Sequence, residues 1–210
     1  MNFTLKHNAE NEIIKGKARL CFGGHLMKEG IDYDPEESFC PGWSSIRLFL
    51  ATAAAEGKRI RTGDISGAYL QGRMQKTLYM HSPHDQKEYD PETGEEILWA
   101  VHGNLYGTKL AAAVWYQDLT TYLESIGFSH NKREPCIFTR RKLRIARGDK
   151  SSNTYSEVKL CVYVDDLAYY GSDEHAVGEF EREIQTKYGD ISPSDPKLYL
   201  GANLIQGEGY

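Results

Sequence analysis

Hydrophobic positions in this chain recur at helical spacing in three segments. Three helices are predicted on this basis: residues 45–56, 110–126 and 174–188. Ser44 or Ser45 is the expected N-cap of the first helix, and Ser172 or Asp173 that of the third. A glycine stands just past the end of each helix, where a left-handed residue is favoured: Gly57, Gly127 and Gly189.

Shorter apolar runs bounded by turn residues predict strands. These runs are residues 17–26, 58–64, 77–82, 96–103, 135–142, 158–164, 167–170 and 197–206. Residues 1–16 are polar and are expected to be irregular, while the hydrophilic segments between 83 and 96 and between 147 and 156 are expected to be loops. Because strands and helices are mixed without strict alternation, the pattern favours an α+β fold.

Composition narrows the range of functions. The 210 residues suffice for one large domain or two small ones, and the formal net charge of −5 argues against a protein that coats nucleic acid. A local basic groove is compatible with that total, because the distribution of charge decides binding. No apolar run is long enough to span a membrane, and the N-terminus lacks an apolar signal core.

The cysteines and histidines do not predict a metal centre. The four cysteines form no CxxC pair, so neither a zinc ribbon nor a thioredoxin motif is indicated, and reduced thiols in an intracellular protein are expected. They are Cys21, Cys40, Cys136 and Cys161. His81, His84 and Asp85 lie close together in a polar loop containing proline, where no metal site is expected.

Two adjacent carboxylates interrupt the apolar segment KLCVYVDDLAYYGS. Asp165 and Asp166 stand between two predicted strands, so we expect them at a hairpin turn. A polar β-turn would be the simplest explanation. However, a two-residue hairpin turn normally contains glycine or asparagine, and adjacent carboxylates repel each other unless a cation holds them. Mg²⁺ is the natural partner, since it prefers carboxylate and phosphate oxygens.

Asp64 is the best candidate for a third carboxylate. It follows RIRT and precedes ISGAYL, at another junction between a strand and a turn. Three carboxylates on neighbouring strand ends can hold two metal ions about 3.5–4 Å apart. Asp64 considered alone is more often an ordinary surface residue, so the hypothesis depends on the combination with Asp165 and Asp166.

Four blocks in a fixed order extend the pattern beyond the aspartates. They are KGKARLCFGGHLMKEGIDYDPEESFCP, SIRLFLATAAAEGKRIRTGDISGAYLQGRMQKTLYM, GNLYGTKLAAAVWYQDLTTYLESIGFSHNKREPCIF and YVDD. Their content and order resemble the reverse transcriptases of copia-type retrotransposons over about residues 15–206. Four ordered blocks are far more specific than the short YVDD motif alone.

The resemblance implies a right-hand polymerase, with fingers and an antiparallel palm sheet packed on helices. The fingers and palm domain would cover residues 17–206, with the palm core at about 58–80 and 105–206. Residues 1–16 would be a polar N-terminal segment, and residues 207–210 a truncated C-terminus. Most of the thumb and the ribonuclease H region of the polyprotein are expected to be missing.

The resemblance also assigns roles to individual residues. It makes Asp64, Asp165 and Asp166 the catalytic, metal-binding carboxylates. Lys17 and Arg19 would grip the incoming triphosphate, since arginine offers a fork of donors to phosphate and lysine a point charge. Without the resemblance, this pair would equally well be a solvated face of a strand.

Four further residues receive nucleotide-binding roles from the resemblance. Tyr69 would lie under the sugar and exclude a 2′-hydroxyl, although it could otherwise be a core aromatic residue beside Leu70. Tyr106, Gly107 and Lys109 would contact the nucleotide and template, and Gly107 would allow close backbone approach. An ordinary turn before the helix is the alternative for these three.

The activity implied is RNA-directed DNA polymerisation. The enzyme would join a deoxynucleoside triphosphate to a primer 3′-hydroxyl on an RNA or DNA template, with two Mg²⁺ ions or Mn²⁺ in their place. The family resemblance places such a protein inside the cell in a cytoplasmic particle. Two alternatives are a catalytically inactive remnant or nucleic-acid-binding fragment, and an unrelated two-metal phosphohydrolase, which the lack of a histidine cluster disfavours.

Overall fold

The structure is a computed structural model that describes residues 1–7, 11–34, 38–145 and 153–207. The chain divides into two compact units. Unit 1 comprises Met1–Ser38 and Tyr69–Trp115, and unit 2 comprises Phe39–Ala68 and Tyr116–Tyr210. Each unit is therefore built from two segments that are distant in the sequence.

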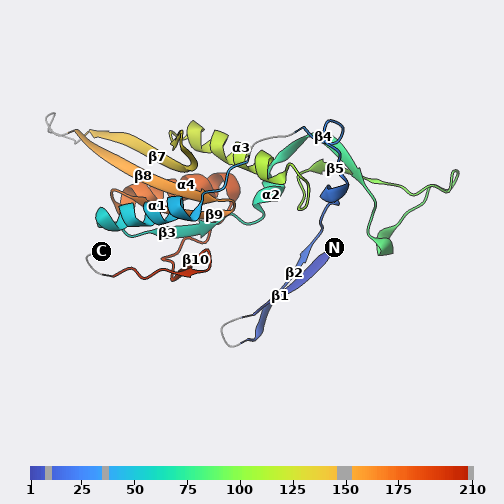
Figure 1. Ribbon diagram of the computed structural model, residues 1–210, viewed down its shortest axis with the longest axis horizontal. Coiled ribbons are helices and arrows are strands. Elements are labelled where there is room, and N and C mark those ends of the chain that lie inside the picture. Colours follow the sequence, from blue (N-terminus) through green and yellow to red (C-terminus); the bar gives the residue numbers. More distant parts are fainter. Residues whose placement is uncertain (8–10, 35–37, 146–152, 208–210) are drawn as a thin grey trace. The chain divides into compact units, whose positions relative to one another are not determined.

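Unit 2 is organised around a five-stranded antiparallel sheet (Figure 1). The strand order is β3 (Arg61–Asp64), β9 (Asp166–Gly171), β8 (Asn153–Tyr163), β7 (Glu134–Ile145) and β6 (Ser129–Asn131). Strands β6 to β9 follow one another along the chain, so each pairs with its neighbour in sequence. Strand β3 comes from much earlier in the chain and pairs with β9 at the edge of the sheet.

Helices cover both faces of this sheet. Helix α1 (Trp43–Ala55) contributes to a core cluster with residues of β8 and β9, and Ala168 and Tyr170 belong to that cluster. On the other face, the ring of Phe180 in α4 (Glu174–Tyr188) lies 5.0 Å from that of Tyr169. Alternate residues of β9 thus reach opposite layers, which explains why Leu167–Tyr170 are apolar without interruption.

Two further elements complete the regular structure of unit 2. Helix α3 (Ala111–Ser125) continues into it from unit 1, and β10 (Leu198–Tyr199) pairs with β11 (Ala202–Asn203). Tyr199 belongs to the same core cluster as α1.

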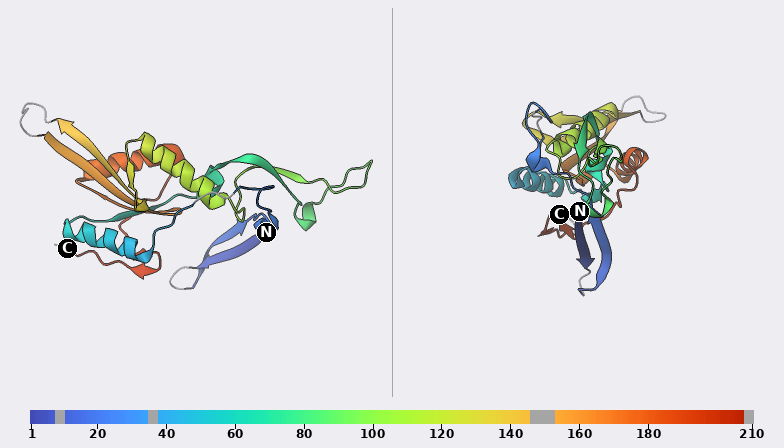
Figure 2. Two further views of the ribbon diagram at one scale, coloured as in Figure 1. Left: turned by 45° about the horizontal axis from the view of Figure 1, so that its top comes forward. Right: turned by 90° about the vertical axis from the view of Figure 1, so that its right-hand side faces the viewer.

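Unit 1 consists of two strand pairs and short helical turns. β1 (Asn2–His7) pairs with β2 (Ile13–Arg19), and β4 (Arg73–Met80) pairs with β5 (Trp99–Gly103). Figure 2 shows the β1–β2 ribbon in blue. The short helices are η1 (Gly24–Leu26), α2 (Ala68–Gln71) and η2 (His84–Gln86). A small core forms around Met27, Leu78 and Val101.

The three predicted helices are confirmed, and helices combined with antiparallel sheets agree with the α+β class. Asp173 caps α4, since its side chain accepts a hydrogen bond from the Ala176 backbone nitrogen at 3.0 Å. The prediction of Ser44 or Ser45 as the cap of α1 is wrong. Gly42 occupies that position in an extended conformation, without a side-chain hydrogen bond.

Two predictions about irregular segments are also wrong. The prediction that residues 1–16 are irregular is wrong for Asn2–His7 and for the start of β2 at Ile13, because these two strands pair with each other; residues 8–10 lie outside the described residues. Of the loop predicted over 147–156, residues 147–152 lie outside the described residues, whereas β8 already begins at Asn153. The start of β8, Asn153–Ser156, is mostly polar, and its order comes from backbone pairing with β7, which a hydrophobic pattern does not reveal.

Within the described part of the chain, no helix is long and apolar enough to cross a membrane.

Candidate functional site

The turn between β8 and β9 carries the first carboxylate. Tyr163 pairs with Asp166, so the two turn residues are Val164 and Asp165. The prediction of a turn at Asp165 and Asp166 is therefore wrong by one residue. Val164 has a φ of 59°, which fits a type II′ turn, where glycine is normally required. A β-branched residue at positive φ is strained, and such strain is often kept at functional sites.

The edge of the sheet brings Asp64 opposite Asp166. The two residues are direct partners in the β3–β9 register. Residues directly opposite in an antiparallel pair have Cβ atoms about 4.5–5.5 Å apart and share one face of the sheet. The Ile65 backbone nitrogen donates a hydrogen bond to the Asp165 carbonyl at 2.9 Å, which ties the turn to the end of β3. The backbone thus gathers all three predicted carboxylates at one end of β3 and β9.

Electrostatic repulsion acts within this group of carboxylates. Burial, together with the neighbouring charges of Asp165 and Asp64, raises the pKa of Asp166 from 3.8 to about 6, and burial is the largest of these causes. Asp64 and Asp165 are exposed, whereas Asp166 is half-buried. A cation near these oxygens would favour ionised Asp166.

The donor set of the cluster fits a hard divalent cation. Carboxylate oxygens are the ligands that Mg²⁺ prefers, and the register pairs two of the three groups. No three Asp, Glu, His or Cys side chains among the described residues are arranged to hold a metal ion together as they stand. Metal binding therefore requires rearrangement of these side chains over a backbone that already brings them to one place.

Three of the predicted nucleotide-binding residues contact one another in unit 1. The Arg19 guanidinium carbon lies 5.5 Å from the centre of the Tyr106 ring, and the Tyr69 ring packs edge-on against Tyr106 at 5.8 Å. The Arg19 Nε atom is buried and has no hydrogen-bond partner among the described residues. Lys17, two residues earlier on β2, shares the Arg19 side of the ribbon.

Glycines allow two backbone segments of unit 1 to touch. Gly107 has a φ of 89°, and a Cβ atom there would lie 2.5 Å from the Phe22 carbonyl oxygen. The Phe22 nitrogen donates to the Tyr106 carbonyl at 2.7 Å. A Cβ atom on Gly24 would lie 1.8 Å from the Gly107 oxygen, so both positions require glycine. The sequence predicted close backbone approach only at Gly107. The adjacent glycines Gly23 and Gly24 were the feature of the sequence that could have indicated the same for Gly24.

Lys109 contacts a residue that the sequence did not single out. Its ammonium group donates a hydrogen bond to the Tyr33 hydroxyl at 3.2 Å and lies 5.1 Å from the ring centre. All six predicted nucleotide-binding residues belong to unit 1, and the three aspartates belong to unit 2.

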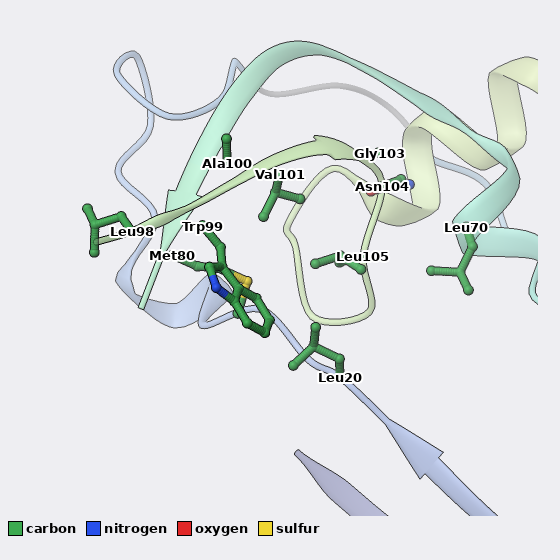
Figure 3. Close-up of a pocket in the computed structure, with 10 residues that line it drawn as sticks. All are labelled: Leu20, Leu70, Met80, Leu98, Trp99, Ala100, Val101, Gly103, Asn104 and Leu105. Carbon is green, nitrogen blue, oxygen red and sulfur yellow. The ribbon is translucent and has the colours of Figure 1, made fainter. Parts of the chain in front are cut away.

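An apolar cavity of about 620 Å³ also lies in unit 1 (Figure 3). Leu20, Trp99 and Leu105 are among the residues around it. Asn104 and the indole of Trp99 carry the polar side-chain atoms among these lining residues, and both ends of the Asn104 side chain are already bonded, to the Ala111 carbonyl and to Thr108. The lining is thus mostly apolar, and its amide side chain is occupied by bonds within the protein.

The cysteines are not part of the candidate site. All four are free of disulfides. Burial raises the pKa of both Cys136 and Cys161 to about 12, which fits core thiols that stay protonated.

Comparison with protein families matches residues 1–210 to "Reverse transcriptase (RNA-dependent DNA polymerase)". The similar proteins include the "Retrovirus-related Pol polyprotein from transposon TNT 1-94" of Nicotiana tabacum, which is 25% identical over 97% of this chain and 14% of the relative. The corresponding polyprotein from transposon RE2 of Arabidopsis thaliana is 31% identical over 95% of this chain and 13% of the relative. The polyprotein from transposon RE1 of the same plant is 32% identical over 81% of this chain and 11% of the relative. No solved structure gives a significant match.

Proposed function

The chain belongs to the reverse transcriptase (RNA-dependent DNA polymerase) family, resembling copia-type Pol polyproteins, and we propose that it forms the fingers and palm of such a polymerase. The reaction would join a deoxynucleoside triphosphate to a primer 3′-hydroxyl on an RNA or DNA template. The observation that carries this proposal is the register of Asp64 opposite Asp166, with Asp165 in the adjoining turn.

Unit 2 would hold the reacting groups. Asp64, Asp165 and Asp166 would bind two Mg²⁺ ions, or Mn²⁺ in their place. When bound, the ions would supply Lewis-acid stabilisation of the attacking and leaving oxygens. The strained turn at Val164 supports this role, because it sets Asp165 directly beside the start of β9. The raised pKa of Asp166 also supports it, since a bound cation would offset the repulsion among the carboxylates.

Unit 1 would bind the nucleotide. Lys17 and Arg19 would contact the triphosphate, and the buried Arg19 Nε atom offers a donor toward an anion. Tyr69 would select against a 2′-hydroxyl, with its ring supported edge-on by Tyr106. The Gly107 turn would place the backbone close to the nucleotide and template.

The polymerase proposal extends to partners outside this chain. The chain spans 11–14% of the length of the curated relatives named above, which are Pol polyproteins. A thumb and a ribonuclease H region of a longer polyprotein would then act together with the fingers and palm.

Primer extension on poly(rA)·oligo(dT) with Mg²⁺ tests the proposal. The wild type should add deoxythymidylate, and Asp166→Asn should lower the rate by about 100-fold or more, as expected when a group acting on the transition state is removed. Asp195→Asn is a matched control in the same unit, because Asp195 is an exposed partner of Arg59. A folded wild-type chain that extends no primer, or an Asp166→Asn variant as active as the control, would contradict the proposal.

A further inference from the structure

Tyr33 is held in a fixed place by a tight turn in unit 1. The Lys28 backbone nitrogen donates to the Asp32 carboxylate at 2.7 Å, and the Gly30 nitrogen donates to the Tyr33 carbonyl at 2.8 Å. Gly30 has a φ of 78°, a conformation that favours glycine. The Tyr33 side chain packs against the small core around Met27, so its ring cannot move freely.

The Lys109 side chain rests on this ring. The Lys109 backbone nitrogen is 3.5 Å from the Met27 sulfur, and its ammonium group donates a hydrogen bond to the Tyr33 hydroxyl, 5.1 Å from the ring centre. A lysine side chain is flexible, and ordering it on binding a ligand opposes binding. Tyr33 removes part of that freedom before any ligand arrives, because its hydroxyl accepts a hydrogen bond from the ammonium group.

The position of Lys109 connects this contact to ligand binding. Lys109 follows the Gly107 turn by two residues and is exposed. An ammonium group has three donors, and the Tyr33 hydroxyl takes one of them. The remaining donors are available to an anion, for which a compact positive charge is well suited.

We propose that Tyr33 is a positioning residue, which presents the Lys109 ammonium group to a phosphate of the bound substrate. This inference rests on the proposed function only for the identity of the substrate that carries the phosphate. The phosphate belongs either to the incoming deoxynucleoside triphosphate or to the backbone of the primer–template.

The test compares Tyr33→Phe, which keeps the ring and the core packing, with the wild-type chain. Equilibrium binding of deoxythymidine triphosphate with Mg²⁺ and of fluorescent poly(rA)·oligo(dT) would be measured, together with KM and kcat for extension. We expect the dissociation constant and KM for one ligand to rise about 2–10-fold, with kcat within about twofold, as for loss of one orienting hydrogen bond. The ligand that is affected identifies the source of the phosphate.

A double variant separates positioning from general damage. If Tyr33 acts through Lys109, then Tyr33→Phe combined with Lys109→Ala binds no more weakly than Lys109→Ala alone. Tyr89→Phe is the matched control, since Tyr89 is an exposed tyrosine of the same unit. Melting temperatures of all variants check that each is folded.

The outcomes separate this inference from the polymerase proposal. Unchanged binding in Tyr33→Phe, additive losses in the double variant, or a wild type that binds neither ligand would overturn the role of Tyr33. A wild type that binds the ligands and extends no primer would refute the polymerase proposal, while the binding comparison would still decide the role of Tyr33.

Discussion

Replacing Asp166 with asparagine should stabilise the fold while it removes the proposed activity. Ionised Asp166 is half-buried beside two other carboxylates, and asparagine has nearly the same shape without the charge. A rise in its pKa from 3.8 to about 6 corresponds to roughly 3 kcal/mol, at about 1.4 kcal/mol per unit. Partial exposure of the side chain screens the charge, so we expect a gain of about 1–3 kcal/mol at neutral pH without metal.

The sign of the pH dependence follows from the raised pKa. A carboxyl group whose pKa is higher in the folded state stabilises the fold when protonated, below about pH 4, and that stability is lost as the pH rises to about 6. The asparagine variant does not undergo this loss. The difference in free energy of unfolding should therefore be small at pH 4 and should open between pH 4 and pH 7.

Urea unfolding followed by circular dichroism would measure this difference, with EDTA present to remove metal. Asp195→Asn is the control, because it breaks an ion pair in which both side chains are 58% exposed. Such pairs contribute about 0–1 kcal/mol, so the control should be neutral or slightly destabilised. Added Mg²⁺ should stabilise the wild type more than Asp166→Asn, since a ligand of the folded state raises stability by mass action.

An Asp166→Asn variant that is less stable than the wild type at pH 7.5 would refute the electrostatic reasoning. An equal gain at pH 4 and pH 7.5 would also refute it, because the effect would then come from packing rather than charge.

Three substitutions test the remaining structural statements. Val164→Gly should raise the melting temperature in EDTA, because relief of the positive-φ strain is worth about 1–3 kcal/mol. The greater entropy of the unfolded chain with glycine offsets only part of this gain. A lower melting temperature would contradict the strained turn. Gly107→Ala should destabilise the chain by about 1–3 kcal/mol in thermal unfolding, because the added Cβ meets the Phe22 carbonyl at positive φ. Arg140→Leu should destabilise the chain by about 1–3 kcal/mol in urea unfolding, because Glu183 loses its buried guanidinium partner and keeps, among the described residues, only Lys142, at 3.4 Å. An unchanged stability would contradict a contribution from this pair.

The sequence alone determined the elements with strong local signals. α1, α3 and α4 each carry an apolar stripe that ends at a glycine, and α4 also has a capping aspartate. The bounds of these helices depend on residues that are close together in the chain, so a single sequence is enough to predict them. The metal-site hypothesis also came from the sequence, because two adjacent aspartates between apolar strands repel each other unless a cation holds them.

Only the tertiary structure decided how distant segments meet. Asp64 faces Asp166 because β3 pairs with β9 at the edge of the sheet. The turn lies at Val164 and Asp165, one residue earlier than predicted, because the pairing of Tyr163 with Asp166 outweighs the poor fit of valine to a turn. The contact between Tyr33 and Lys109 joins residues 76 positions apart. Register and long-range packing are settled by the whole fold, since shifting a strand by one residue leaves the local pattern intact and turns every side chain to the other face.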